Sequence, residues 1–236
     1  MKILLFAAVC AAMVSLSAEE ITISKAKNLQ PISQKIPVDV SKDYVFTFGT
    51  KGGGGKLHVY FFQFNDAQRR IGSHHVWGNA DSVTELVGPA IRGANEFVVK
   101  DASKWKKPMP QAGTNIVAFD AKADGSDLPN FKIDYYIKDV TQLADGTWKV
   151  EMKTPLRRSS PAGTLVRQHY DGGHLSVTVS LPADKTFTAT IKAAKGLGPY
   201  LDAWWPGVKL VQLYAQTSDD TPVTITQWTL KEAAAK

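Results

Sequence analysis

The sequence predicts an all-β fold, a β-sandwich of the jelly-roll type with a β-rich insertion in the middle of the chain. From Ile21 onward, short runs that alternate apolar and polar residues are separated by Gly, Pro, Asp and Asn, the pattern of strands and turns. No window of helical length carries a sustained apolar stripe with a 3.6-residue period. Runs at this spacing favour a sandwich, in which two sheets each bury one face.

Residues 1–17, MKILLFAAVCAAMVSLS, have the composition of a secretory signal peptide. Lys2 precedes an apolar run from Ile3 to Val14, and the small residues Ser15 and Ser17 occupy the −3 and −1 positions of a cleavage point. The run is shorter than the roughly 20 apolar residues that span a bilayer. We therefore expect a secreted or periplasmic protein without a transmembrane segment. The alternative is an N-terminal core helix.

The only cysteine, Cys10, lies inside this leader. Residues 18–230 therefore contain no thiol, which excludes disulfides, thiolate catalysis and cysteine-ligated zinc from them. Acylation of Cys10 is the alternative, but it would leave an apolar stretch attached. We expect residues 18–230 to form one domain that is stabilised by an ordinary hydrophobic core.

The chain carries 28 Lys and Arg residues against 22 Asp and Glu residues, a net charge of +6. The basic residues are scattered, with short clusters only at residues 104–107 and 157–158. They form no continuous basic stripe of the kind that contacts a phosphate backbone. This distribution argues against a nucleic-acid partner. It is compatible with an acidic polysaccharide or a cell surface.

The first half of the chain is expected to form short strands around one glycine-rich turn. Four glycines, Gly52 to Gly55, supply the positive φ angles of a tight return, so the flanking runs predict a β-hairpin. No Gly-Lys-Ser/Thr ending follows that would favour a phosphate-binding loop. The expected strands are Ile21–Ser24, Gln34–Val40, Tyr44–Thr50, Leu57–Phe64, Arg69–Trp77, Ser82–Val87 and Glu96–Val99.

The β-rich insertion is expected at about residues 100–170. It begins with a surface loop, residues 101–114, that is rich in Lys, Pro and Gly. The strands that follow are expected at Asn115–Phe119, Phe131–Val140, Thr147–Lys153 and Leu165–His169, with a turn at Asp145-Gly146.

Regular spacing returns in the last third of the chain. The expected strands are Leu175–Leu181, Thr186–Ile191, Val208–Ala215 and Val223–Leu230. Residues 231–236, KEAAAK, favour a helix but are too few for an isolated one, which is marginal below roughly 12 residues. We expect a C-terminal tail there.

Two segments resemble the halves of a carbohydrate-binding-module-like jelly roll of the galactose-binding-like group. The first is IPVDVSKDYVFTF with the LHVYFFQFND run that follows, and the second is WWPGVKLVQLYAQTSDDTPVTITQWTL. Between them, DLPN, GTWKVEM and PAGTLVRQHYDGG are similar to the middle of secreted modules found with polysaccharide-degrading proteins of environmental bacteria. The resemblance implies a jelly roll that binds carbohydrate.

Sugar binding on a β-sandwich requires flat aromatic rings that face solvent. Adjacent residues of an extended chain point to opposite sides, so one ring of Trp204-Trp205 can lie in the core while the other is exposed. The alternative is that both are buried. Trp77 and Trp105 lie in less regular segments, where exposure is expected.

Arg167, His169 and Tyr170 form the densest polar and aromatic group of the sequence. Arg167 and His169 share one face of a strand. Arg suits bidentate recognition of a carboxylate, and the group could contact sugar hydroxyls and carboxylates. Two alternatives remain: His and Tyr as base and acid in β-elimination from a uronic-acid polymer, or a solvated strand end.

No cofactor is expected, with a structural calcium ion as the alternative. Asp120, Asp124, Asp127 and Asn130 provide oxygen groups in one loop, but their spacing matches no defined calcium loop and suits turns equally. The adjacent pair His74-His75 lacks a third metal ligand at a convincing spacing.

The sequence therefore favours a non-catalytic, exported carbohydrate-binding protein that holds a polysaccharide or glycan near the cell surface or near carbohydrate-active enzymes. Its expected binding residues are Trp77, Trp105, Trp204, Trp205, Arg167, His169 and Tyr170. One alternative is a polysaccharide lyase or glycoside hydrolase on the same scaffold. Another is a surface or assembly protein that packs against copies of itself.

Overall fold

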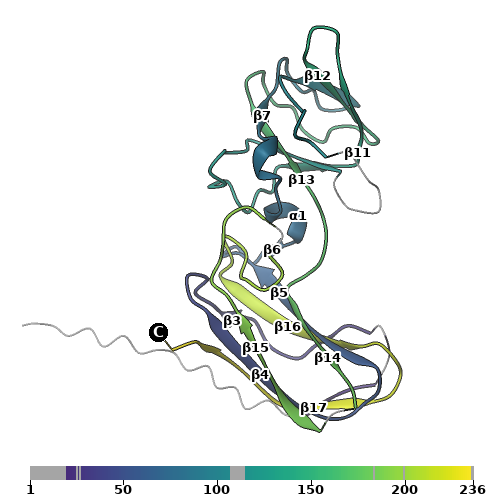
Figure 1. Ribbon diagram of the computed structural model, residues 1–236, viewed down its shortest axis with the longest axis vertical. Helices are drawn as coiled ribbons and strands as arrows, with labels where there is room; N and C mark the ends of the chain where they lie inside the picture. The colour runs from purple at the N-terminus through teal and green to yellow at the C-terminus, as the bar shows by residue number, and fades with distance from the viewer. Residues whose placement is uncertain are drawn as a thin grey trace, which may run out of the picture.

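The chain folds into two β-rich lobes, one above the other in Figure 1, joined at a narrow waist. The computed structural model describes residues 20–24, 26, 28–106, 115–182, 184–198 and 200–234. The expected signal peptide, residues 1–17, and the last two residues of the expected tail lie outside the described residues, as do residues 107–114 of the expected surface loop.

The lower lobe consists of two antiparallel sheets. Sheet I has the order β1 (Ile21–Ile23), β17 (Val223–Glu232), β4 (Tyr44–Gly52) and β15 (Lys185–Ile191). Sheet II has the order β14 (Ser176–Ser180), β5 (Lys56–Phe64), β16 (Leu210–Thr217) and β2 (Gln30–Pro31), with β3 (Ile36–Pro37) paired to β16 and β6 (Arg70–Ile71) paired to β5.

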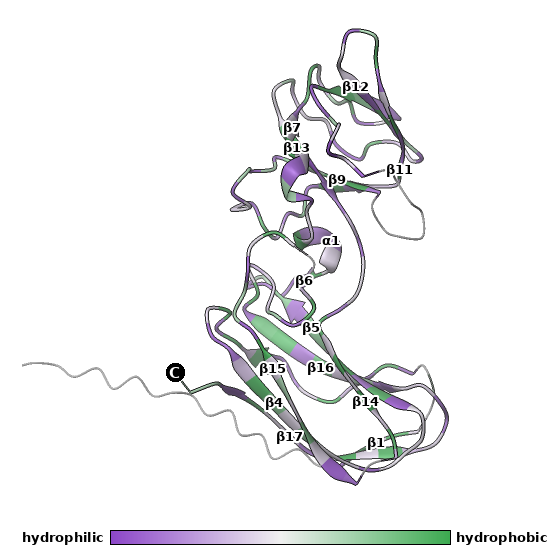
Figure 2. Cartoon of the chain, in the orientation of Figure 1, coloured by the Kyte–Doolittle hydropathy of each residue, from purple (hydrophilic) through white to green (hydrophobic). Residues whose placement is uncertain are grey.

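The two sheets bury a common core because their strands alternate in polarity. Phe46 and Phe48 of β4 point from sheet I toward Phe61 of β5 in sheet II, and the rings of Phe46 and Phe61 meet edge to face at 5.0 Å. Each large apolar side chain buried in this way contributes about 1.5–3 kcal/mol. In Figure 2, hydrophilic and hydrophobic residues follow one another along the strands of the lower lobe. The predicted all-β sandwich is confirmed, and its jelly-roll connectivity stays a prediction.

The predicted hairpin around Gly52–Gly55 is wrong. β4 and β5 lie in different sheets: β4 pairs with β17 and β15, and β5 pairs with β14 and β16. Gly53 has a φ of +90°, and a side chain there would meet Leu181 and Val223 at 2.7 and 2.9 Å. The glycines therefore form a tight corner that carries the chain from one sheet to the other.

The upper lobe has two sheets and a separate core. One sheet has the order β10 (Ile133–Tyr135), β9 (Ile116–Phe119), β13 (Leu165–His169) and β7 (Thr84–Glu85), and the other has β11 (Ile137–Gln142), β12 (Trp148–Met152) and β8 (Glu96–Val99). Its main core cluster runs in sequence from Leu86 to Val166, a span that begins before the expected insertion at about 100–170 and covers most of it.

The waist contains both passages of the chain between the lobes. The outgoing passage includes the single turn of helix α1 (Ser73–Val76), and the 3-10 turn η1 (Ala80–Ser82) follows it. The returning passage lies beside the outgoing one. Tyr170 donates its backbone N–H to the carbonyl of Trp77 at 3.1 Å, and Gly78 and His169 form an isolated antiparallel β-bridge. Only Arg70–Ile71 of the predicted strand Arg69–Trp77 is extended and paired.

At the C-terminal end, β17 continues to Glu232, so the first two residues of the expected tail pair with β4. None of the helices in the described parts of the chain has the length and apolar character needed to cross a membrane.

Candidate functional site

The four tryptophans expected to bind a ligand are all buried. Trp204 is 0% exposed and Trp205 3%, so both rings of the pair lie in the lower core. The expectation of exposure is also wrong for Trp77 and Trp105, which are 4% and 8% exposed. The indole N–H groups of Trp105 and Trp205 donate to the backbone carbonyls of Ser82 and Tyr200. These rings serve packing, and none presents a face to a ligand.

Arg167 and His169 are fully buried in a hydrogen-bond network at the waist. The guanidinium of Arg167 forms a two-bond ion pair with Asp127, at 2.8 and 3.2 Å, and its Nε donates to His169 Nε2 at 3.0 Å. Because guanidinium can only donate, Nε2 accepts, and the proton on Nδ1 is donated to the backbone carbonyl of His74 at 2.9 Å. The donors of this pair are committed to protein groups rather than to a sugar.

Tyr170 is half-buried beside this network. Its ring lies 6.0 Å from that of Trp77, and the ammonium of Lys106 lies 5.8 Å from its centre. Burial raises the pKa of its hydroxyl. The role of Tyr170 as a ligand-binding residue stays a prediction.

In the loop that was considered as a calcium site, the carboxylates of Asp120, Asp124 and Asp127 bond to protein groups. Asp127 accepts from Arg167 and Asn130, Asp124 accepts from the backbone N–H of Ser126, and Asp120 pairs with Lys132. Within the described residues, no group of three or more His, Cys, Asp or Glu side chains is arranged to hold a metal ion.

The solvent-facing side of sheet II carries a row of rings, His58, Tyr60, Phe62 and Tyr214, which we call the aromatic platform. All four are half-buried, while the alternate residues of β5 point into the core. Tyr60 lies directly opposite Tyr214 in the register of β5 and β16, and the rings of Phe62 and Tyr214 are 4.5 Å apart with an interplanar angle of 32°. The platform therefore spans two adjacent strands.

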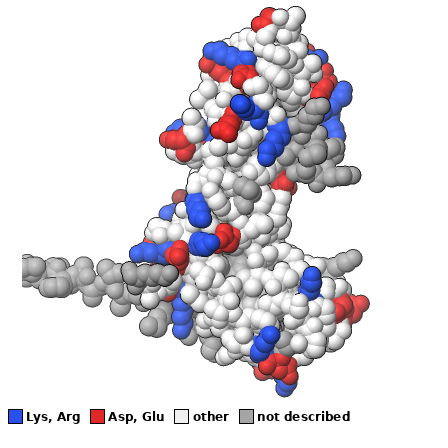
Figure 3. Space-filling view, viewed as in Figure 1, with Lys and Arg blue, Asp and Glu red and all other residues white. Residues whose placement is uncertain are grey.

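Uncharged polar groups surround the aromatic platform. Gln212 and Gln216 of β16 lie opposite Phe62 and His58, and Thr178 of β14 bonds to His58 Nδ1 at 2.9 Å. Figure 3 shows few charged side chains over the body of the lower lobe, with Lys, Arg, Asp and Glu gathered at its margins and at the waist. The rings and planar amides of the platform are themselves uncharged side chains.

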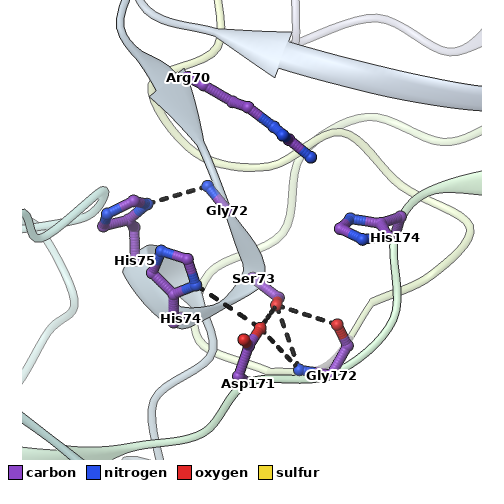
Figure 4. Close-up of a pocket in the computed structure, with 8 residues that line it drawn as sticks. All are labelled: Arg70, Gly72, Ser73, His74, His75, Asp171, Gly172 and His174. Atoms are coloured by element: carbon purple, nitrogen blue, oxygen red, sulfur yellow. Dashed lines mark hydrogen bonds and ion pairs between the residues drawn. The ribbon is translucent and has the colours of Figure 1, made fainter. Parts of the chain in front are cut away.

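One end of the platform opens into a cavity of about 260 Å³ at the waist. The guanidinium carbon of Arg70 lies 3.8 Å from the centre of the Phe62 ring, and the ring of His174 lies 6.0 Å from both Tyr60 and Phe62. Figure 4 shows Arg70 and His174 on one side of this cavity, with His74, Ser73 and Asp171 on the other. The lining residues are Arg70, Gly72, Ser73, His74, His75, Asp171, Gly172 and His174.

The charges in the waist cavity are fixed by burial and by hydrogen bonds. Hydrogen bonding from His74, together with Ser73, lowers the pKa of Asp171 to about 2 against the effect of burial, so this carboxylate is ionised at neutral pH. Burial, and then the neighbouring His74, lowers the pKa of His75 to about 3, so its ring is neutral. Burial and the charge of Arg70 also lower the pKa of His174. Arg70 and Asp171 therefore carry opposite charges in one cavity.

Two catalytic arrangements are not formed by the described residues of the waist cavity. Ser73 Oγ bonds to Asp171 and to the carbonyl of Gly172, and no histidine in the described chain bonds to it, so a Ser-His-Asp triad is not formed. A glycosidase needs two carboxylic groups that face each other across the sugar, and among the described residues that line the cavity Asp171 is the single carboxylate. The waist cavity is suited to binding through donors and one acceptor.

Sequence reasoning missed the aromatic platform and the waist cavity, although a signal for the platform was present. Every second residue from His58 to Phe62 is a ring, between residues that are also apolar. A strand with apolar residues on both faces is either covered on both sides or uses one face for contact. Comparison of the chain with protein-family models, with curated proteins and with solved structures finds no match in any of the three.

Proposed function

We propose that this chain is a non-catalytic glycan-binding protein, and that it holds a polysaccharide on the aromatic platform of sheet II. The observation that carries the proposal is the row Tyr60, Phe62 and Tyr214, whose half-buried rings lie on the solvent side of a sheet that already has a complete core on its other side. The leader-like residues 1–17 and the resemblance to carbohydrate-binding modules support an exported protein of this class.

The chemistry of the platform matches that of a sugar chain. A pyranose has one apolar face of C–H groups, which packs on an aromatic ring, and a rim of hydroxyls, which bond to planar amides and hydroxyls. Gln216 of β16 provides such an amide, while the amide of Gln212 bonds to the carbonyl of Ser33 and to the hydroxyl of Tyr214 and so fixes the Tyr214 ring. Because the rings are anchored in neighbouring β-strands, little conformational entropy is lost when the ligand binds.

Replacing Tyr60 and Phe62 together by leucine should weaken glycan binding about tenfold or more, equivalent to about 1.4 kcal/mol. Leucine keeps apolar bulk on the sheet but removes the flat face. Retardation of the protein in native gels that contain a panel of neutral and acidic polysaccharides would measure the effect. Thermal unfolding of each variant would show that the sheet is retained.

The matched control is Ile91→Ala, which removes an apolar side chain that is 52% exposed on the upper lobe. Its retardation should equal that of the wild type. Unchanged retardation of the Tyr60 and Phe62 double variant on a glycan that the wild type binds would refute the aromatic platform as the binding surface. A wild type that migrates freely through the whole panel would refute the function.

A further inference from the structure

The waist cavity continues the aromatic platform, and two side chains belong to both. Arg70 stacks on Phe62 and lines the cavity, and His174 contacts the rings of Tyr60 and Phe62 from the returning passage of the chain. A chain of sugars lying along the platform therefore has its next unit at the cavity. With a volume of about 260 Å³, the cavity is smaller than the range of about 300–1,000 Å³ typical for drug-sized ligands. This size suits a single sugar unit.

The donors and acceptors of the cavity are unlike those of the platform. Arg70 presents a fixed fork of N–H donors that matches a planar carboxylate or a sulfate, and its stacking on Phe62 restricts its orientation. His174, which is an exposed residue, stands beside it. On the opposite wall, Asp171 is an ionised acceptor that is held by Ser73 and lies 3.5 Å from His74 Nδ1.

This combination discriminates among sugars. A neutral sugar would leave the guanidinium of Arg70 without an anionic partner, and a bare anion would meet Asp171 without a hydroxyl to donate to it. A sugar unit with an anionic substituent and neighbouring hydroxyls satisfies both walls at once. A further basic group, Arg69 on Phe131, lies at the same waist and adds to the attraction for an anion.

We infer that the waist cavity is a subsite for the anionic group of an acidic glycan, with Arg70 as the residue that selects the charge and Asp171 as the acceptor for an adjacent hydroxyl. The inference rests on the proposed glycan binding and names its substrate class. A uronate carboxylate and a sulfate ester share the chemistry that Arg70 recognises.

The test compares each acidic polymer with its neutral counterpart on the same protein. Titration calorimetry would use polygalacturonate against its methyl ester, and dextran sulfate against dextran. The wild type should bind one acidic member about tenfold more tightly than its neutral partner, the scale of one charge-assisted hydrogen bond. The pair that shows the preference identifies carboxylate or sulfate as the recognised group.

Arg70→Gln should remove this preference and reduce the salt dependence of binding, so that the acidic polymer binds no more tightly than its neutral partner. Arg70→Lys should keep part of the preference, because it retains the charge without the fork. The matched control is Arg92→Gln, which removes the same charge from an exposed turn of the upper lobe.

Two results would overturn the inference and leave the proposed function standing. They are equal affinity of the wild type for acidic and neutral polymers, and a preference that is retained in Arg70→Gln. Absence of binding to all four polymers would overturn both the inference and the proposed function.

Discussion

Asp127→Ala is expected to lower the free energy of unfolding by about 3–5 kcal/mol, the cost of leaving a buried charge without its partner. The side chain of Arg167 is 0% exposed and that of Asp127 7%, so water cannot replace the lost carboxylate. Although burial raises the pKa of Asp127, hydrogen bonds from Asn130 and the charge of Arg167 hold it below its usual range. Urea unfolding followed by circular dichroism would measure the loss.

The control for this variant is Asp124→Ala in the same loop, which removes an exposed carboxylate that bonds to the backbone of Ser126. Its cost should be much smaller, because the carboxylate of Asp124 is exposed and water can replace the lost bond. Adding Arg167→Met to Asp127→Ala should recover part of the loss, because the unpaired charge is then removed. Equal stability of the two single variants would show that the ion pair contributes nothing beyond a turn contact.

Acidification is expected to destabilise the fold between about pH 6.5 and pH 4, before most carboxylates titrate. Burial, and then the charge of Arg167, lowers the pKa of His169 from 6.5 to about 4. In this window the unfolded chain binds a proton at this position and the folded chain does not, so stability falls as the pH falls. The full difference between the two pKa values corresponds to about 3 kcal/mol at and below pH 4. Thermal unfolding at half-unit pH intervals would follow it.

His169→Gln should flatten the curve between pH 6.5 and pH 4, even though the variant is less stable at neutral pH. His75, whose pKa is about 3, contributes in the same direction and would leave a residual slope. His58→Gln is the matched control, because this ring is half-buried on the aromatic platform and its removal should leave most of the slope in place. A pH profile identical in His169→Gln and wild type would contradict the buried neutral ring.

The sequence predicted strands well where local alternation decides them, and less well where distant partners do. The predicted strand Leu165–His169 coincides with β13, and β1, β4, β5, β8 and β15 lie within two residues of their predicted bounds. Phe131–Val140 was predicted as one strand, but Tyr136 has a φ of +71° and divides it into β10 and β11, which belong to different sheets. A turn of this kind forms because the strands on its two sides pair in different sheets, and local sequence does not show that pairing.

The glycine corner at Gly52–Gly55 illustrates the same limit. Positive φ angles serve a hairpin and a passage between sheets equally. The choice depends on β15 and β17, more than a hundred residues later, which take both edges of β4. The glycines therefore predicted the turn correctly, but they did not predict which strands pair with the two strands that flank it.

The binding residues were misplaced for a related reason. Large rings in irregular segments, such as Trp77 and Trp105, suggested exposure, but the waist and the upper core close over them. The rings of the aromatic platform were visible in the sequence, yet β5 is apolar on both faces, so periodicity could not say which face lies outside. The waist cavity joins residues near position 72 to residues near position 172, which no spacing rule connects.

The contact between the two passages of the waist also bears on how the chain folds. Ser73 bonds to the carbonyl of Gly172, 99 residues later in the sequence. Closing a flexible loop of that length costs about 4 kcal/mol of chain entropy. The upper lobe has its own core and holds both of its ends side by side, so a chain in which this lobe is already folded has a much shorter loop to close when β14 pairs with β5. A folded upper lobe thus brings β5 and β14, which are far apart in the sequence, close enough to pair.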